Sequence, residues 1–305
     1  MPTNTGLRVG LALGSGAARG WSHIGVIHAL AEMDIVADVV CGTSIGALVG
    51  ASYVSGRLDR LEEWACSLTR LETARFFEIN ASLNGFVNSQ RLRRFLNETV
   101  ASDDDVIESF AKDYSAISTD LETGREVWLT KGSLLQAVWA SIALPGLFPA
   151  IKNERKWLVD GGLVNPVPVS VCRALGADIV IAVNLNDGIV GKHFVKAHDQ
   201  PSEEEDAGRG VGERITGLFK EYTSSWIGSF EDEEHAPGLL DTIAGSINIT
   251  QDRITRSRLA GDPADVVVSP DLSALGLLEF YRAREAIDVG RSCVHEKRAA
   301  IENVL

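Results

Sequence analysis

Cysteine is scarce in this sequence and is never clustered. The 305 residues contain only 4 cysteines, which lie far apart and form neither a Cys-x-x-Cys pair nor a metal-ligand spacing. They are Cys41, Cys66, Cys172 and Cys293. We therefore expect no disulfide framework and no metal site, and we predict reduced, buried thiols in a cytoplasmic protein.

Long hydrophobic runs are also missing. No stretch reaches the roughly 18 consecutive apolar residues that a transmembrane helix requires. The first residues, Met-Pro-Thr-Asn-Thr-Gly-Leu-Arg, lack the basic residues followed by an apolar run that make a signal peptide. Both observations predict a cytoplasmic location and no membrane-spanning helix.

Positive charge is in deficit. The chain has 29 Lys and Arg residues against 42 Asp and Glu residues, which gives a formal net charge of −13. A nucleic-acid partner requires a basic surface, so none is expected. General adhesion to anionic lipid is also disfavoured, which leaves only contact through a local basic or apolar patch. Otherwise the composition, 45% hydrophobic and 23% charged, is that of an ordinary globular protein.

Short apolar strands alternate with amphipathic helices over the first two thirds of the chain. Predicted strands at Leu7–Leu13, Val39–Cys41 and Ala177–Asn184 are separated by predicted helices such as 21–33 and 57–70. A hairpin is predicted from 116 to 130. This alternation predicts an α/β fold, layered α/β/α, with a mainly parallel central sheet.

Composition changes near residue 187 and suggests how the domain is organised. We expect a core domain over 7–186, a mobile acidic loop over 187–212, and a helical C-terminal part over 213–305 with one further strand in the same domain. Within Ile215–Phe230 the apolar residues have helical spacing. That helix either packs on the core or serves as a lid or a peripheral membrane contact, and the sequence does not decide between these roles.

A serine between two glycines organises the chain. We call Gly42–Gly46 the serine turn: it follows an apolar strand and opens a helix in the pattern Gly-x-Ser-x-Gly. Such a turn requires strained backbone angles, and Gly42 and Gly46 leave room where side chains would clash. Ser44 is then exposed at a helix N-terminus, where a nucleophile is favoured. The alternative interpretation is a small-residue turn that only lets the helix pack on the sheet.

Two more segments carry candidate chemistry. The glycine-rich loop Gly14-Ser15-Gly16-Ala17-Ala18-Arg19-Gly20 follows the first strand and offers backbone N–H groups to a phosphate or an oxyanion. Its spacing does not fit a dinucleotide fingerprint.

Farther along, an apolar strand ends at Asp160, which enters the turn Gly161-Gly162, a sequence that is also common in ordinary turns. The consecutive carboxylates Asp103–Asp105 are interpreted as a solvated helix start. In a parallel sheet the C-terminal strand ends share one edge, which predicts that Ser44, Asp160 and the loop meet there.

These three motifs, in this order, resemble those of the patatin-like phospholipase family, especially its bacterial single-domain members. The resemblance covers about residues 7–184 and implies a Ser–Asp dyad without histidine, with Ser44 as nucleophile and Asp160 as base. It further implies an oxyanion hole from the backbone of Gly16, Ala17, Ala18 and Arg19, hydrolysis of acyl esters in phospholipids or other acyl lipids, and no cofactor. Ser15 and Ala17 replace two glycines of the family pattern, and alanine would be strained at a position that requires positive φ.

Alternatives stay open at this point. A Ser-Asp-His triad would use a late histidine, His193, His198, His235 or His295, although none has a motif around it. A regulatory or interaction protein with little or no turnover on the same scaffold is the alternative from another class. Arg19 either faces an anionic headgroup or pairs with a carboxylate and sets the loop. The natural substrate, its chain length and the oligomeric state are not indicated.

Overall fold

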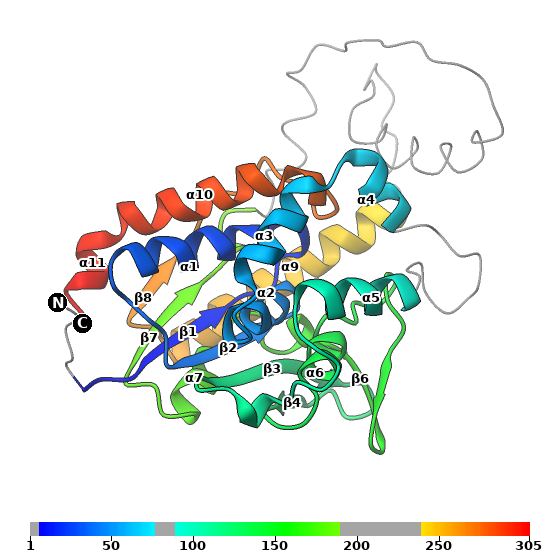
Figure 1. The fold of residues 1–305 in the computed structure, drawn as a ribbon, viewed down its shortest axis with the longest axis horizontal. Coiled ribbons are helices and arrows are strands. Elements are labelled where there is room, and N and C mark those ends of the chain that lie inside the picture. The colour runs from blue at the N-terminus through cyan, green and yellow to red at the C-terminus, as the bar shows by residue number, and fades with distance from the viewer. Residues whose placement is uncertain (1–5, 77–88, 190–238) are drawn as a thin grey trace, which may run out of the picture.

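A computed structural model describes residues 6–76, 89–189 and 239–305. The predicted mobile loop lies almost entirely outside the described residues, and so does the predicted helix at Ile215–Phe230. In the described part the chain forms one central sheet between two layers of helices (Figure 1). The fold class predicted from the sequence is therefore confirmed.

The sheet is mainly parallel in its centre and antiparallel at one side. Its order is β5-β6-β3-β2-β1-β7-β8, with β4 paired to β3. Neighbours from β3 through β8 are parallel, whereas β4, β6 and β5 join by antiparallel pairing. The strands are β1 Val9–Leu13, β2 Val39–Thr43, β3 Asp113–Asp120, β4 Glu126–Leu129, β5 Ile151–Asn153, β6 Lys156–Asp160, β7 Ile179–Val183 and β8 Val266–Val268.

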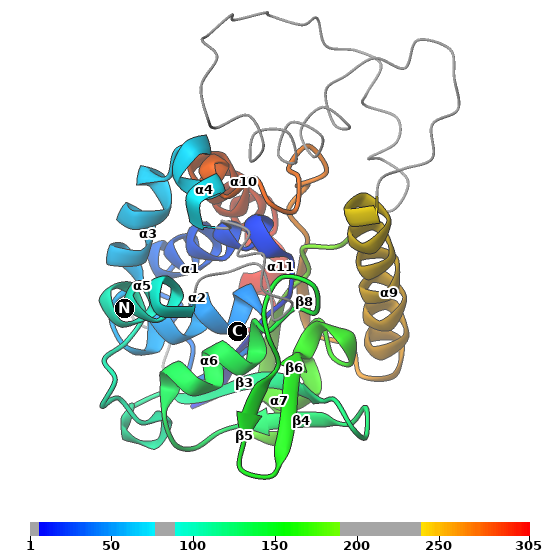
Figure 2. The same ribbon diagram turned by 90° about the vertical axis from the view of Figure 1, so that its right-hand side faces the viewer.

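Helices cover both faces of this sheet. Figure 2 shows α9 on one side, with α1, α2, α3 and α5 on the other. The helices are α1 Ser22–Glu32, α2 Ile45–Val54, α3 Leu58–Ser67, α4 Arg70–Phe76, α5 Ser89–Thr99, α6 Leu134–Ser141, α7 Val169–Ala174, α9 Leu239–Gly261, α10 Ala283–Glu296 and α11 Arg298–Glu302. Short 3₁₀ helices span Ala17–Trp21, Ile107–Ser109, Gly161–Leu163 and Phe280–Arg282.

The central strands are buried on both faces, which explains their nearly continuous apolar sequences. All five residues of β1, β2 and β7 are buried. One face, with Leu11 and Leu13, packs against the layer of α1, α2 and α10, and the other, with Ala12 and Cys41, packs against α7. Because two separate apolar clusters sandwich the sheet, its strand ends are fixed and can position polar groups.

The chain's last long helix closes this core by unusually close packing. α10 lies along α1, and Gly25 and Gly290 stand at the contact. A Cβ atom on Gly25 would lie 1.9 Å from the Ile287 carbonyl oxygen, and one on Gly290 would lie 2.1 Å from the Ser22 carbonyl oxygen. The segment after residue 261 therefore belongs to the same packed body as the first helix.

Two local expectations differ from the structure. Asp103–Asp105 do not start a helix: the Asp105 carboxylate accepts from the Ser102 N–H at 2.6 Å and closes a turn. All four cysteines are free thiols, but Cys66 is only partly buried.

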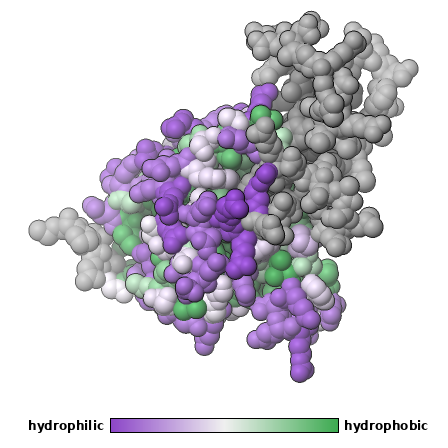
Figure 3. Space-filling model, turned by 45° about the vertical axis from the view of Figure 1, so that its right-hand side comes forward, coloured by the Kyte–Doolittle hydropathy of each residue, from purple (hydrophilic) through white to green (hydrophobic). Residues whose placement is uncertain are grey.

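Among the helices of the described ranges, none is both long and apolar enough to cross a bilayer. The face in Figure 3 is largely hydrophilic, with apolar residues in separate small groups.

Candidate active site

The serine turn joins β2 to α2 through a strained residue. Ser44 has φ 58° and ψ −124°, a region that non-glycine residues rarely occupy. Both glycines are required by close approach: a Cβ on Gly42 would lie 2.4 Å from the Gly46 carbonyl carbon and oxygen, and one on Gly46 would lie 2.2 Å from the Leu13 carbonyl oxygen. The backbone is thus packed tightly enough to hold Ser44 in this conformation, partly exposed at the start of α2.

Ser44 and Asp160 meet directly. The Ser44 hydroxyl donates a hydrogen bond to Asp160 Oδ2 at 2.5 Å. The other carboxylate oxygen, Oδ1, accepts from the Gly162 N–H at 2.7 Å, and the Thr119 hydroxyl donates to the Asp160 carbonyl oxygen at 2.8 Å. Asp160 is only 1% exposed. The carboxylate is therefore held in one orientation, with one oxygen committed to the serine.

Strand register explains why two residues so distant in sequence meet. Thr43 pairs with Ile117 of β3, and Asp160 pairs with Ser118, the next residue of the same strand. Because β4 occupies the other side of both positions, β2 and β6 lie end to end along one side of β3. Asp160 thus arrives on an antiparallel strand and not along the parallel edge that the sequence suggested.

Burial changes the acidity of Asp160. Loss of hydration raises the pKa of this carboxyl from 3.8 to about 6, against the opposing effect of the hydrogen bonds from Ser44 and the Gly162 N–H. An ordinary aspartate is a poor proton acceptor for a hydroxyl near neutral pH. The raised pKa makes Asp160 a stronger base while leaving it mostly ionised at pH 7.

In the glycine-rich loop most backbone donors are already engaged. The N–H groups that donate to backbone carbonyls are those of Gly14, Ser15, Ala18 and Arg19. Within the described residues, the N–H groups of Gly16 and Ala17 have no protein acceptor, since the first bond of the 3₁₀ helix runs from Arg19 to Gly16. Ala17 has φ 50°, so the strain expected there from the sequence is present. Of the four residues considered for an oxyanion hole, Gly16 and Ala17 are the ones with available donors.

An apolar cavity of about 80 Å³ adjoins both motifs. Ser44 and Ala17 line it together with Leu48 and Phe148. Aromatic side chains form part of the wall: the ring centroids of Trp64 and Phe95 lie 4.0 Å apart, and Trp21 makes edge contacts with Trp64 and Phe280. The nucleophile candidate therefore faces a space suited to hydrocarbon.

A family model described as Patatin-like phospholipase matches residues 11–173, which include all three motifs. The chain belongs to the patatin-like phospholipase family. It is 33% identical to an uncharacterized NTE family protein of Mycobacterium bovis over 97% of this chain and 92% of that protein. It is also 28% identical to the lysophospholipase NTE1 of Pyricularia oryzae, in a match that covers 93% of this chain but only 18% of that protein. Membership of this family makes the chain a lipid acyl hydrolase.

Sequence reasoning missed several residues that hold the site in place. Ser141, at the end of α6, accepts a hydrogen bond from the Ser44 N–H at 2.9 Å and donates to the Ile117 carbonyl oxygen at 2.5 Å. Asn248 and Gln251 of α9 contact the glycine-rich loop. The apolar residues around Ser141 indicated a helix but not its contact with Ser44. Nothing in the sequence linked α9 to the loop.

Arg19 is a structural part of the loop in this arrangement. It is fully buried, and burial lowers its pKa to about 10. Its Nη2 donates to Asn248 Oδ1 at 2.8 Å and its Nε donates to the Gly16 carbonyl oxygen at 3.3 Å. Within the described part of the chain no carboxylate pairs with it. The buried side chain does not match the expected headgroup contact; it sets the loop, as the other expectation had it, but through Asn248 and the Gly16 carbonyl oxygen and not through a carboxylate.

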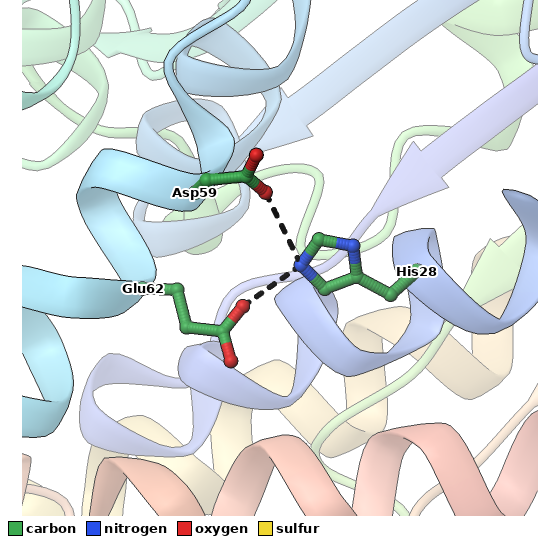
Figure 4. Close-up of side chains that lie close together, drawn as sticks. All are labelled: His28, Asp59 and Glu62. Carbon is green, nitrogen blue, oxygen red and sulfur yellow. Dashed lines mark hydrogen bonds and ion pairs between the residues drawn. The ribbon is translucent and has the colours of Figure 1, made fainter.

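The histidines of the described ranges have other partners. Burial lowers the pKa of His23 to about 4, and its Nε2 lies 2.8 Å from the Gly14 carbonyl oxygen. His28 of α1 faces Glu62 and Asp59 of α3, at 2.8 and 3.8 Å (Figure 4). His295 lies 3.5 Å from Glu32. The remaining late histidines, His193, His198 and His235, lie outside the described residues.

Proposed function

We propose that Ser44 and Asp160 form a catalytic dyad that hydrolyses acyl ester bonds of phospholipids or related acyl lipids. The proposal depends mainly on one observation, the 2.5 Å hydrogen bond from the Ser44 hydroxyl to a buried carboxylate. The cavity beside Ser44 and the membership of the family support it. Ser44 is the nucleophile and Asp160 the general base, with oxyanion donors from the Gly16 and Ala17 N–H groups.

In the first half of the reaction, Ser44 Oγ attacks the ester carbonyl carbon and its proton passes to Asp160 Oδ2. The carbonyl oxygen becomes an oxyanion, which the Gly16 and Ala17 N–H groups stabilise. When the intermediate collapses, the bond to the leaving alcohol breaks and that oxygen takes the proton from Asp160. The product is an acyl enzyme on Ser44 and a free alcohol, which carries the headgroup.

In the second half, a water molecule replaces the alcohol. Asp160 accepts a proton from the water as its oxygen attacks the acyl carbon, and a second oxyanion forms in the same place. Collapse breaks the bond to Ser44 Oγ, which takes back the proton from Asp160 and releases a fatty acid. One carboxylate therefore serves both halves, and its pKa of about 6 lies close enough to neutrality for it to accept and return the proton.

The cavity indicates which part of the substrate binds where. Apart from Ser44, its lining is nearly all apolar, so we propose that it takes the acyl chain while the headgroup stays outside. An apolar cavity beside Ser44 suits a lipid that places one acyl chain near the serine. Since relatives include proteins named lysophospholipase, lysophospholipids are the first lipids to test.

Labelling with a fluorophosphonate tests the nucleophile. We expect stoichiometric modification at Ser44 in the wild type and none in Ser44→Ala. The Ser44→Ala variant should also lose about 10⁶-fold of the activity on a soluble short-chain ester. Ser55→Ala, at the end of α2, is a matched control that should label normally. A folded sample without labelling, or Ser44→Ala with more than a few per cent of activity, would overturn the dyad and favour a scaffold with little turnover. A panel of lysophospholipids and phospholipids then ranks substrates.

A further inference from the structure

Helix α9 carries a polar face that is buried. Its residues Asn248, Gln251, Asp252 and Thr255 are 7%, 5%, 7% and 2% exposed, while Ile249 is 50% exposed. Positions three, four and seven residues apart lie on one face of a helix. A helix on a protein surface normally buries its apolar face. This one buries polar side chains instead, and α9 lies outside the region 11–173 that matches the family model.

The buried face contacts the glycine-rich loop at two points. Asn248 Oδ1 accepts from Arg19 Nη2 at 2.8 Å, and Gln251 Oε1 accepts from the Ser15 hydroxyl at 2.9 Å. Gln251 Oε1 also accepts from Asn186 Nδ2 at 3.2 Å, and Asn186 Nδ2 donates to the Ser15 carbonyl oxygen at 3.3 Å. All of these groups are buried, so the bonds form away from water, where leaving one unmade is costly.

These contacts flank the strained part of the loop. Ser15 and Arg19 stand on either side of Gly16 and Ala17, and Ala17 is held at φ 50°. Arg19 also reaches back to the Gly16 carbonyl oxygen through its N–H, at 3.2 Å, and its Nε, at 3.3 Å. A residue in a sparsely populated region persists only where its surroundings fix it. α9 supplies the acceptor for the Ser15 hydroxyl and the acceptor for Arg19 Nη2, and Asn186 adds a bond to the Ser15 carbonyl oxygen.

We propose that Asn248 and Gln251 are positioning residues that hold the Gly16 and Ala17 N–H groups in place for the oxyanion. The inference depends on the proposed function and adds α9 to the apparatus of the same site. It also gives a role to Ser15, which stands where the family pattern has glycine: its hydroxyl is the group that Gln251 binds. Asn248 acts in the same way through Arg19.

Replacement of Gln251 tests this role. Gln251→Leu keeps the volume and removes the acceptor, so the loop should shift and kcat on a soluble ester should fall by about 10²-fold with little change in KM. Affinity for a trifluoromethyl ketone, a mimic of the tetrahedral intermediate, should fall in parallel. Gln251→Glu keeps an acceptor oxygen and should restore most of kcat at pH 8. Ile249→Ala, on the exposed face, should behave as wild type.

Rates are expressed per reactive serine, counted by fluorophosphonate titration, so that misfolded protein does not lower kcat. Ser15→Ala removes the same hydrogen bond by changing the residue on the loop. It replaces Gln251→Leu as the test variant if Gln251→Leu does not fold. In a double-mutant cycle the two substitutions should be less than additive, because both break the bond between the Ser15 hydroxyl and Gln251. Additive effects, or Gln251→Leu with unchanged kcat and unchanged analogue affinity while Ser44 still labels, would overturn the inference. Failure of labelling in wild type would instead count against the dyad.

Discussion

The serine turn and the glycine-rich loop each contain a residue at positive φ, but different structures hold them there. Ser44 has φ 58° and Ala17 has φ 50°. In the serine turn, Gly42 lies directly against main-chain atoms of Gly46, and Gly46 lies against those of Leu13 at the end of β1. The loop is tied by side chains of α9 and Asn186. One strained residue is therefore fixed by backbone packing and the other by removable side-chain contacts.

This difference has consequences for substitution. Main-chain atoms of a central sheet cannot move aside without displacing their strand, so the serine turn has no room for an added atom. Side-chain contacts can be removed one at a time. We therefore expect changes of shape in the serine turn to affect folding and activity together, and changes around the loop to affect activity while the fold persists.

Among substitutions that leave the nucleophile in place, the largest effect is expected from Asp160→Asn, which keeps the shape of the serine turn and removes its base. Since a positioned general base contributes about 10²–10⁴-fold, kcat/KM on a soluble ester should fall by up to about 10⁴-fold. Asp120→Asn on β3 is a matched control, because Asp120 is also buried, at 4% exposure, but contacts neither motif. Activity within a few fold of wild type in Asp160→Asn would contradict the assignment.

Adding one methyl group to each motif compares their tolerance directly. The Cβ of Gly42→Ala would lie 2.4 Å from main-chain atoms of Gly46, whereas that of Gly16→Ala would lie 2.8 and 2.9 Å from Leu185 Cδ1 and Cβ, which are side-chain atoms. We expect a loss in unfolding free energy of about 3 kcal/mol or more for the first and about 1 kcal/mol for the second. Urea unfolding measures both, and equal losses would remove the distinction.

Asp160→Asn should also change stability in a pH-dependent way. The folded pKa of about 6 is above the ordinary value of 3.8, so this carboxyl stabilises the fold at low pH and that contribution is lost as pH rises through 6. The asparagine variant should match wild type near pH 3.5 and exceed it by about 3 kcal/mol above pH 7. A stability difference that does not vary with pH would show that the carboxyl is not perturbed.

The smallest effect concerns Ala17. Ala17→Gly relieves the left-handed strain and should raise the unfolding free energy by up to about 1 kcal/mol. Its neighbour Ala18 is buried and has no positive φ, so Ala18→Gly should lower the unfolding free energy by about 1 kcal/mol. Opposite signs at adjacent positions, measured by denaturant unfolding, are the expected result. A loss at both positions would mean that the loop is not strained.

Much of the architecture was predictable because its signals are local. Apolar runs identified β1, β2, β7 and β8, and the hairpin of β3 and β4 followed from its turn sequence. The strain at Ser44 followed from two glycines with a known steric purpose. Such features depend on a few neighbouring residues, so one sequence contains enough information to predict them.

The features that the sequence did not predict depend on contacts between residues far apart in the chain. The Asp160 strand joins the sheet antiparallel, and only the register on β3 reveals that it ends beside β2. Arg19 and Asn248 are 229 positions apart, and Ser15 and Gln251 are 236 apart. Neither polar residue of α9 has a local pattern that marks it, because a buried polar face looks like an exposed one in sequence.

The central claim is that Asp160, without a histidine, activates Ser44, and the pH dependence of Ser44 phosphonylation by a neutral fluorophosphonate tests it most directly. We predict a rate that rises about tenfold per pH unit up to about pH 6 and then levels. This rise of the rate with pH should persist when His193, His198, His235 and His295 are all replaced, and should vanish in Asp160→Asn. A rise with pH that survives in Asp160→Asn, or one that disappears when the histidines are replaced, would contradict the account.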